Sequence, residues 1–166
     1  MIQRLQSIFL LLIAVALMTA LFFPLWYEKG SSFDGLEMIE LNVYQLVHGL
    51  IDENGNYTKI INVKSTVYIS FFYFLATAIA LYSLFQYKKR IRQIYLGAVN
   101  SLVIGGSVLF SWMVYVSPAE SIVDPASTGN MGIGIYFLIT ALLFNTIANR
   151  LIRRDEKMVK ESDRLR

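Results

Sequence analysis

Asp52, Asn54 and Asn56 come closest to a set of metal ligands, because oxygen side chains at alternate positions are typical of calcium loops. Such a loop also needs a glycine at its sixth position and a bidentate Glu at its twelfth. Gly55 stands at the fourth position and Val63 at the twelfth. We therefore interpret this segment as a turn and predict no metal site in it.

Other side chains that could do chemistry are few. The chain has no cysteine, which excludes disulfides, thiol catalysis and thiolate metal sites, and His48 is its single histidine. A hydrolase or transferase embedded in a membrane needs a nucleophile, a base or a metal held together, and the sequence offers no such combination. We predict that the protein is not an enzyme, that it has no catalytic residue, metal or cofactor, and that His48 is structural.

The elements that position these residues belong to a membrane protein. Hydrophobic residues make up 55% of the 166 residues and charged residues only 16%, against about a quarter in soluble domains. Four long apolar runs explain this composition: residues 5–24, 65–87, 94–116 and 131–149. A helix rises ~1.5 Å per residue, so each run is long enough to approach the ~30 Å hydrocarbon thickness. We predict a four-helix transmembrane domain over residues 1–149.

The first run is interpreted as a permanent span. It is longer than the 7–15-residue apolar core of a secretory signal. Its one good pair of small residues for cleavage, Ala14 and Ala16, lies inside the apolar run, so cleavage there would leave too short a core. We therefore expect this segment to remain part of the fold.

Basic residues predict the orientation. Lys and Arg number one before the first run, four in residues 88–93 and seven after Asn149, against three in the two remaining connecting segments together. The cytoplasmic side of membrane proteins carries the excess of Lys and Arg. We predict a multi-pass protein of the bacterial inner membrane with both termini in the cytoplasm.

The first outer segment, residues 25–64, contains the signal of a hairpin. Two runs rich in β-branched and aromatic residues, 40–51 and 57–63, flank Asn54-Gly55, and a tight turn of that type needs positive φ at both residues. The second outer segment, residues 117–130, is interpreted as a solvated connector. The predicted fold class is therefore an all-α membrane protein, a four-transmembrane-helix bundle with a small extracytoplasmic β-hairpin.

Small and polar residues in the third and fourth runs predict how the helices pack. Gly97, Ser101 and Gly105 are four residues apart and share one face, which lets helices approach closely in lipid. Asn100 and Asn145 should share one depth, so we expect them to hydrogen-bond each other or neighbouring backbone. Packing within the bundle, oligomerisation through the glycine stripe and a polar ligand site at the two amides remain open.

The predicted cytoplasmic surfaces are basic. The candidate contacts with lipid or a partner are Lys88, Lys89, Arg90, Arg92, Arg153 and Arg154. Residues 150–166 are predicted to form an amphipathic tail, with Leu151, Met158 and Leu165 at heptad spacing. This tail could continue the fourth helix, and it would then lie on anionic headgroups or dock on a protein.

Both ends of the chain resemble a known family. The start MIQRLQSIFLLL, the motif FFPLW at Phe22–Trp26 and the finish RRDEKMVKESDRLR at Arg154–Arg166 are similar to a family of small four-span inner-membrane proteins of Bacteroidetes, filed as domain of unknown function 4293. The resemblance implies a bacterial inner-membrane location and four helices. It implies no activity and no site residues.

The function is predicted from what these observations exclude. The apolar runs contain no ionisable residue, whereas coupled transporters usually carry such groups in their ion path. We expect a non-enzymatic structural or accessory subunit of a larger membrane assembly. The alternative is a bundle in the bacterial envelope that binds or transports a lipid or small molecule. The expected partners are membrane lipids and other inner-membrane proteins, and not nucleic acid; a homo-oligomer remains open.

Overall fold

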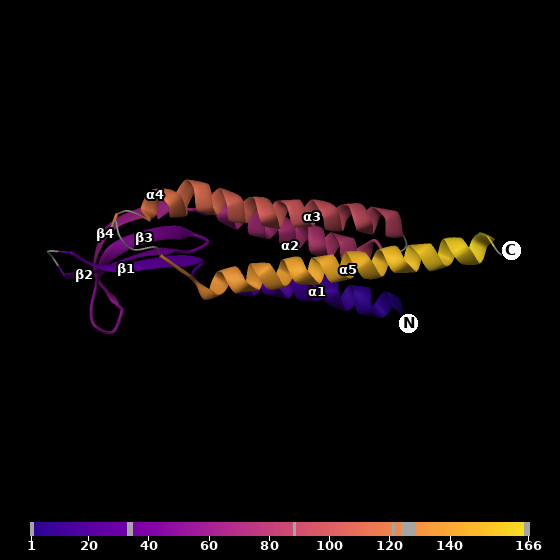
Figure 1. Ribbon diagram of the computed structural model, residues 1–166, viewed down its shortest axis with the longest axis horizontal. Coiled ribbons are helices and arrows are strands. Elements are labelled where there is room, and N and C mark those ends of the chain that lie inside the picture. The colour runs from indigo at the N-terminus through magenta and orange to yellow at the C-terminus, as the bar shows by residue number, and fades with distance from the viewer. Residues whose placement is uncertain (1, 33–34, 88, 121, 124–128, 165–166) are drawn as a thin grey trace. The chain divides into compact units, whose positions relative to one another are not determined.

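A computed structural model of the chain describes residues 2–32, 35–87, 89–120, 122–123 and 129–164 (Figure 1). The chain divides into two compact units. The helical unit comprises Met1–Met18, Phe72–Gly105 and Leu138–Arg166, and the sheet unit comprises Thr19–Phe71 and Gly106–Phe137.

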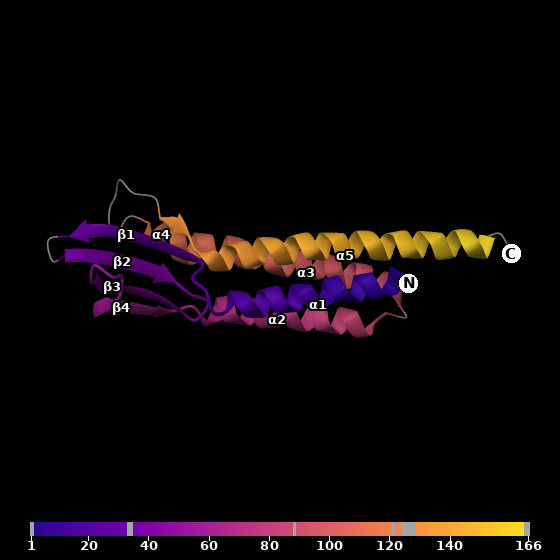
Figure 2. The same cartoon turned by 90° about the horizontal axis from the view of Figure 1, so that it is seen from below.

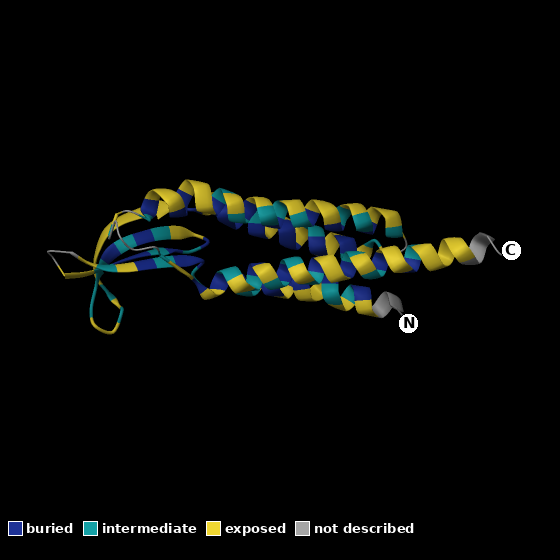
Figure 3. Ribbon diagram, in the orientation of Figure 1, coloured by how far each residue is buried: buried dark blue, intermediate teal, exposed yellow. Residues whose placement is uncertain are grey.

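The helices are α1 (Ile2–Ala20), α2 (Val67–Phe85), α3 (Arg90–Ser111), a π-helical segment η1 (Trp112–Val116), α4 (Ser117–Ala119) and α5 (Ile133–Arg164). Figures 1 and 2 show α1, α2, α3 and α5 side by side in the helical unit. One face of each helix is buried, and on α3 the buried positions are Gln93, Gly97, Asn100, Ile104, Ser107 and Ser111, three or four residues apart (Figure 3). This spacing follows the helical period.

Three helices are long and apolar enough to cross a membrane: Val67–Phe85, Arg90–Ala119 and Ile133–Glu161. This finding is consistent with the predicted membrane protein. The apolar part of α1, Leu5–Ala20, is shorter. The helix ends at Ala20 because the chain then leaves for β1 through Pro24, which cannot continue a helix. The segment predicted as a tail continues α5 without a break as far as Arg164.

The prediction of an all-α, four-span bundle with a small hairpin is wrong. The sheet unit contains a five-stranded antiparallel sheet in the order β4-β3-β2-β1-β5 (Figure 2). Its strands are β1 (Trp26–Ser32), β2 (Gly35–Leu41), β3 (Gln45–Ile51), β4 (Tyr57–Ser65) and β5 (Asn130–Met131). Charged residues at Glu28, Lys29, Glu37 and Glu40 gave β1 and β2 the sequence character of a polar loop. Pairing with neighbouring strands satisfies their backbone groups nevertheless.

The predicted hairpin is confirmed as β3 and β4, with Val47 opposite Val63. Its turn differs from the expected type. The N–H of Gly55 donates to the Asp52 carbonyl at 3.0 Å, and Gly55 has φ +85°. No other residue type has a positive φ in the described part of the chain, so Asn54 does not. A β-turn followed by a left-handed glycine makes a longer connection than the two-residue turn expected from Asn-Gly.

Side chains at the start of α2 anchor this helix to the loop between β2 and β3. The Thr66 hydroxyl donates to the Asn42 carbonyl at 2.9 Å, and the Ser70 hydroxyl donates to the Val43 carbonyl at 2.7 Å. Thr66 alone separates the end of β4 from the start of α2. The direction of β4 is therefore tied to the first turn of α2 within the sheet unit.

Candidate functional site

Asn145 forms the polar contact between α5 and α3. Its Nδ2 donates to the Gly97 carbonyl and to the Ser101 hydroxyl, both at 2.7 Å, and the residue is fully buried. The sequence-based expectation that Asn145 bonds neighbouring backbone is thus met by two members of the small-residue stripe on α3. Buried polar contacts of this kind join helices inside lipid.

Asn100 does not form the predicted hydrogen bond. It is buried on α3, but in the described part of the chain neither its Oδ1 nor its Nδ2 has a hydrogen-bond partner. The direct bond between Asn100 and Asn145 that the sequence suggested is therefore not formed. Both amides nevertheless point into the helical unit, because both side chains are buried.

The glycine stripe divides into a packed part and an open part. A Cβ built on Gly97 would lie 2.0 Å from Oδ1 of Asn149, so a larger residue there requires the Asn149 side chain to move. A Cβ on Gly105 would meet nothing within 4 Å. Close helix approach therefore depends on Gly97 and Ser101, whereas Gly105 does not take part in it.

A second polar layer, which the sequence analysis missed, lies at the other end of the buried faces in the helical unit. Gln6 donates through Nε2 to Oδ2 of Asp155, and Gln93 donates through Nε2 to the Ser83 carbonyl at 2.8 Å. All four side chains are at least 95% buried. One sequence pattern could have revealed this layer. Asn145, Ala148, Ile152 and Asp155 follow one another at intervals of three or four residues, which puts Asp155 on the buried face of α5.

The predicted basic contacts surround two open grooves of the helical unit. Lys89, Arg90 and Arg92 line a groove of about 450 Å³ together with Ile91 and Glu156 of α5. Arg153 lines another groove of about 310 Å³ with Thr146, Asn149 and Arg150. Arg154 is exposed, and Lys88 lies outside the described residues. The structure thus brings the α2–α3 connection and the late part of α5 together.

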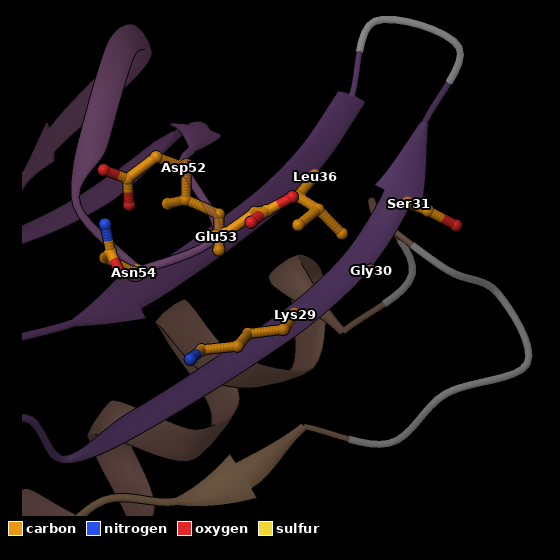
Figure 4. A pocket seen from close by; sticks show the side chains of 9 residues that line it. Lys29, Gly30, Ser31, Leu36, Asp52, Glu53 and Asn54 are labelled. Atoms are coloured by element: carbon orange, nitrogen blue, oxygen red, sulfur yellow. The ribbon is translucent and has the colours of Figure 1, made fainter.

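The sheet unit has an open groove of about 460 Å³ beside the turn between β3 and β4 (Figure 4). Lys29 of β1 reaches along this groove, and Asp52, Glu53 and Asn54 come from the turn. The backbone N–H of Asn56 donates to Oδ1 of Asp52 at 2.8 Å. This hydrogen bond holds the pKa of the Asp52 carboxyl below its ordinary value. The Asp52 carboxylate therefore accepts a hydrogen bond within its own turn, which agrees with the interpretation of this segment as a turn and not as a calcium loop.

His48 takes part in a contact within the sheet. Its Nε2 lies 3.0 Å from Oε2 of Glu37 on the neighbouring strand, and both side chains are largely buried. His48 also lines a small groove of about 140 Å³ with Asn62, Lys64 and apolar residues of β2, β3, η1 and α4. Ligand pockets usually hold ~300–1,000 Å³, so this groove is too small for a typical ligand.

Strand β4 forms one edge of the sheet and is exposed along nearly its whole length. Every residue after Tyr57 is exposed, and about half or more of the surface of Ile60, Ile61 and Val63 is accessible (Figure 3). Only Lys59 and Lys64 add charge to these nine residues, and the strand has no proline. Proteins usually protect such edges with charges, prolines, bulges or a covering element, and β4 carries two lysines and two register shifts in its pairing with β3.

Comparison with known families relates this architecture to other chains. A family model described as Domain of unknown function (DUF4293) matches residues 2–165. The chain belongs to this family. The match covers both the helical unit and the sheet unit of this DUF4293 member, and the description names no activity. No curated protein matches the chain.

Proposed function

We propose that this DUF4293 protein is a non-enzymatic accessory subunit of a membrane assembly, and that the edge of β4 binds an extended segment of a partner protein. The observation that carries the proposal is the nine-residue edge strand whose side chains are exposed on both faces. A strand edge presents unpaired backbone N–H and C=O groups, which an added strand satisfies. Such β-augmentation takes affinity from main-chain hydrogen bonds and specificity from alternate side chains.

The side chains of β4 define the chemistry of the partner. Ile60 and Val63 pair with Gly49 and Val47 of β3 and share one face, because register shifts at Thr58 and Ile61 interrupt the simple alternation of side chains. Lys59 and Lys64 pair with Leu50 and Leu46 and share the other face. Cross-strand apolar pairs and opposite charges each contribute about 0.2–1 kcal/mol. A segment with β-branched residues at its centre and carboxylates opposite Lys59 and Lys64 therefore fits this edge best.

The partner is a different chain and not a second copy. An edge that carries two lysines and no carboxylate complements an acidic strand better than it complements itself.

Photo-crosslinking in cells tests this function. A photoreactive amino acid replaces Ile61, and another replaces Leu36, which is similarly exposed but lies on β2 inside the sheet. We expect one protein to be crosslinked at position 61 through a single peptide, and not at position 36. Adding Ile60→Lys should abolish the crosslink, because a charge at the edge opposes strand addition. A crosslink to a second copy, or identical products at both positions, contradicts the proposal.

We further propose that the sheet unit faces away from the cytoplasm of a bacterial inner membrane, and that both termini lie in the cytoplasm. The support is the cluster of Lys89, Arg90 and Arg92 with the late part of α5, and the hydrogen bond from Gln6 to Asp155, which puts the start of α1 at the same end of the helical unit.

The absence of cysteine makes the orientation easy to test. Glu53→Cys lies in the β3–β4 turn and Glu161→Cys lies near the end of α5, and both positions are exposed. A thiol reagent that does not cross membranes should label the first variant in intact spheroplasts and the second only after lysis. An epitope tag ahead of the chain should resist added protease in the same way. Labelling of Glu161→Cys in intact spheroplasts refutes this orientation.

A further inference from the structure

Each of the four long helices contributes one buried polar side chain to the layer at the α2–α3 connection. The members of this polar layer are Gln6 of α1, Ser83 of α2, Gln93 of α3 and Asp155 of α5. Gln6 contacts Asp155, and Gln93 contacts the backbone of Ser83. All four belong to the helical unit.

Helix geometry puts the two contacting pairs at one level. Gly97 of α3 faces Asn149 of α5. Gln93 lies four residues before Gly97, about 6 Å along the helix, and Asp155 lies six residues beyond Asn149, about 9 Å along. The two helices run in opposite directions, because Gly97 and Ser101 of α3 face Asn149 and Asn145 of α5 respectively. Gln93 and Asp155 are therefore within about 3 Å of the same height.

Three oxygens of the polar layer have no hydrogen-bond partner in the described part of the chain: Oδ1 of Asp155, Oε1 of Gln93 and Oγ of Ser83. The orientation of the Gln93 amide follows from its contact, because its nitrogen faces a carbonyl, which only accepts. The same reasoning orients Gln6, whose nitrogen faces the carboxylate. The layer thus contains three buried oxygens without a hydrogen-bond donor, one of them on a carboxylate.

We propose that the polar layer binds a monovalent alkali cation. A buried carboxylate and unpaired acceptors are costly in a low-dielectric interior, and a cation offsets both costs. Hard cations take oxygen ligands, and Ca²⁺ sites gain affinity from several carboxylates. One carboxylate with an amide and a hydroxyl oxygen matches a single positive charge instead.

The basic side chains that the structure describes near the layer do not occupy this site. Lys89, Arg92, Arg153 and Arg154 are exposed, and Arg90 is partly exposed. Water and salt screen the charges of these basic side chains, whereas the carboxylate of Asp155 is buried within the layer. Glu156, which follows Asp155 on the helix, faces the groove with Lys89 and Arg92 instead of the layer.

Thermal unfolding of the purified full chain in detergent tests the proposal. The midpoint is measured at equal ionic strength in the chlorides of sodium, potassium and N-methyl-D-glucamine. We expect sodium or potassium to raise it by about 3–6 °C at a tenfold excess over the dissociation constant, because only the folded state holds the site. The large organic cation should give no increase.

Two matched variants assign the effect to the layer. Asp155→Asn keeps the size of the side chain and its contact with Gln6 but removes the charge, so the dependence on the alkali cation should disappear. Glu156→Gln removes the same charge one residue away, outside the layer, and should keep the full shift. Ser83→Ala removes one oxygen and should require a higher cation concentration for the same shift.

Equal midpoints in the three chlorides overturn the proposal, as does an alkali-cation shift that survives in Asp155→Asn. If Asp155→Asn does not fold, binding of radioactive sodium or rubidium to the unchanged protein decides the question. Saturable binding that unlabelled sodium or potassium displaces and choline does not supports the site. No saturable binding overturns it.

Discussion

The contrast between Gly97 and Gly105 gives the sharpest test of how the helical unit packs. Both glycines belong to the stripe predicted from sequence, and both lie inside α3. Replacing either by alanine gains about 0.5–1 kcal/mol of helix propensity. Only at Gly97 does the added Cβ meet another helix, at 2.0 Å from Oδ1, 2.5 Å from Nδ2 and 2.6 Å from Cγ of Asn149.

The size of the effect follows from these distances. Ordinary van der Waals contact of a Cβ begins near 3.4 Å, so the amide of Asn149 must move by more than 1 Å. Inserting a methyl group into packed surroundings costs about 1–3 kcal/mol. We therefore expect Gly105→Ala to stabilise the protein by about 0.5–1 kcal/mol, and Gly97→Ala to be about 1 kcal/mol less stable than Gly105→Ala, the low end of the range, because the Asn149 amide is a side-chain end that can rotate away.

Reversible unfolding of the full chain in mixed micelles, with increasing denaturing detergent, measures both variants. Asn149→Ala provides the control, because it removes the atoms that the new Cβ would meet. In that background Gly97→Ala should lose its cost and resemble Gly105→Ala. Equal stabilities of the two single alanine variants, or a cost at Gly97 that persists after Asn149→Ala, would refute the proposed close contact between α3 and α5.

Three further predictions follow from single contacts. Asn145→Leu should lower the free energy of unfolding by about 1–2 kcal/mol in the same assay, because two buried hydrogen bonds are lost. The Asp52 carboxyl should titrate by NMR below its ordinary value of 3.8, and its stabilisation of the turn, present above the unfolded pKa, should be lost as the pH falls through this lower folded pKa. Gly132→Ala should cost about 1–3 kcal/mol or more, because its Cβ would lie 2.2 Å from the Pro24 carbonyl oxygen, which cannot rotate away as a side chain can.

Each of these has a matched control. Thr146→Val removes only a hydroxyl that bonds within its own helix at an exposed position, so a cost as large as that of Asn145→Leu would argue against a special role for Asn145. A titration midpoint of Asp52 at or above 3.8 would show that the hydrogen bond from Asn56 is not formed. Gly106→Ala meets no neighbour within 4 Å, and an equal loss there would show that the contact with Pro24 is unimportant.

The sequence predicted the parts of the site that depend on local pattern. Asn145 was identified because a carboxamide inside an apolar run needs a partner, and Gly97 and Ser101 because small residues recur at helical spacing. Asp52 was recognised as a turn residue from the wrong positions of Gly55 and Val63 for a calcium loop. These arguments use only spacing along one element.

The polar layer was not predicted because its members lie far apart in the chain. Asp155 stands in a charged segment whose sequence is typical of a solvated tail, and Gln6 precedes it by 149 residues. Burial of Asp155 depends on how α5 packs against α1, which no local pattern reveals. Asn100 shows the opposite case, since its burial was predicted but the hydrogen bond predicted for it is not formed in the described part of the chain.

The sequence by itself determined three helices of membrane length and the β3–β4 hairpin, because uninterrupted apolar runs and a glycine turn leave the backbone few alternatives. Only the tertiary structure decided that β1, β2 and β5 complete a sheet, that β4 is its exposed edge, and that Asp155 is buried. The physical reason is that strand pairing and the burial of a charge are satisfied by partners distant in sequence, whereas helical backbone bonds are satisfied within four residues.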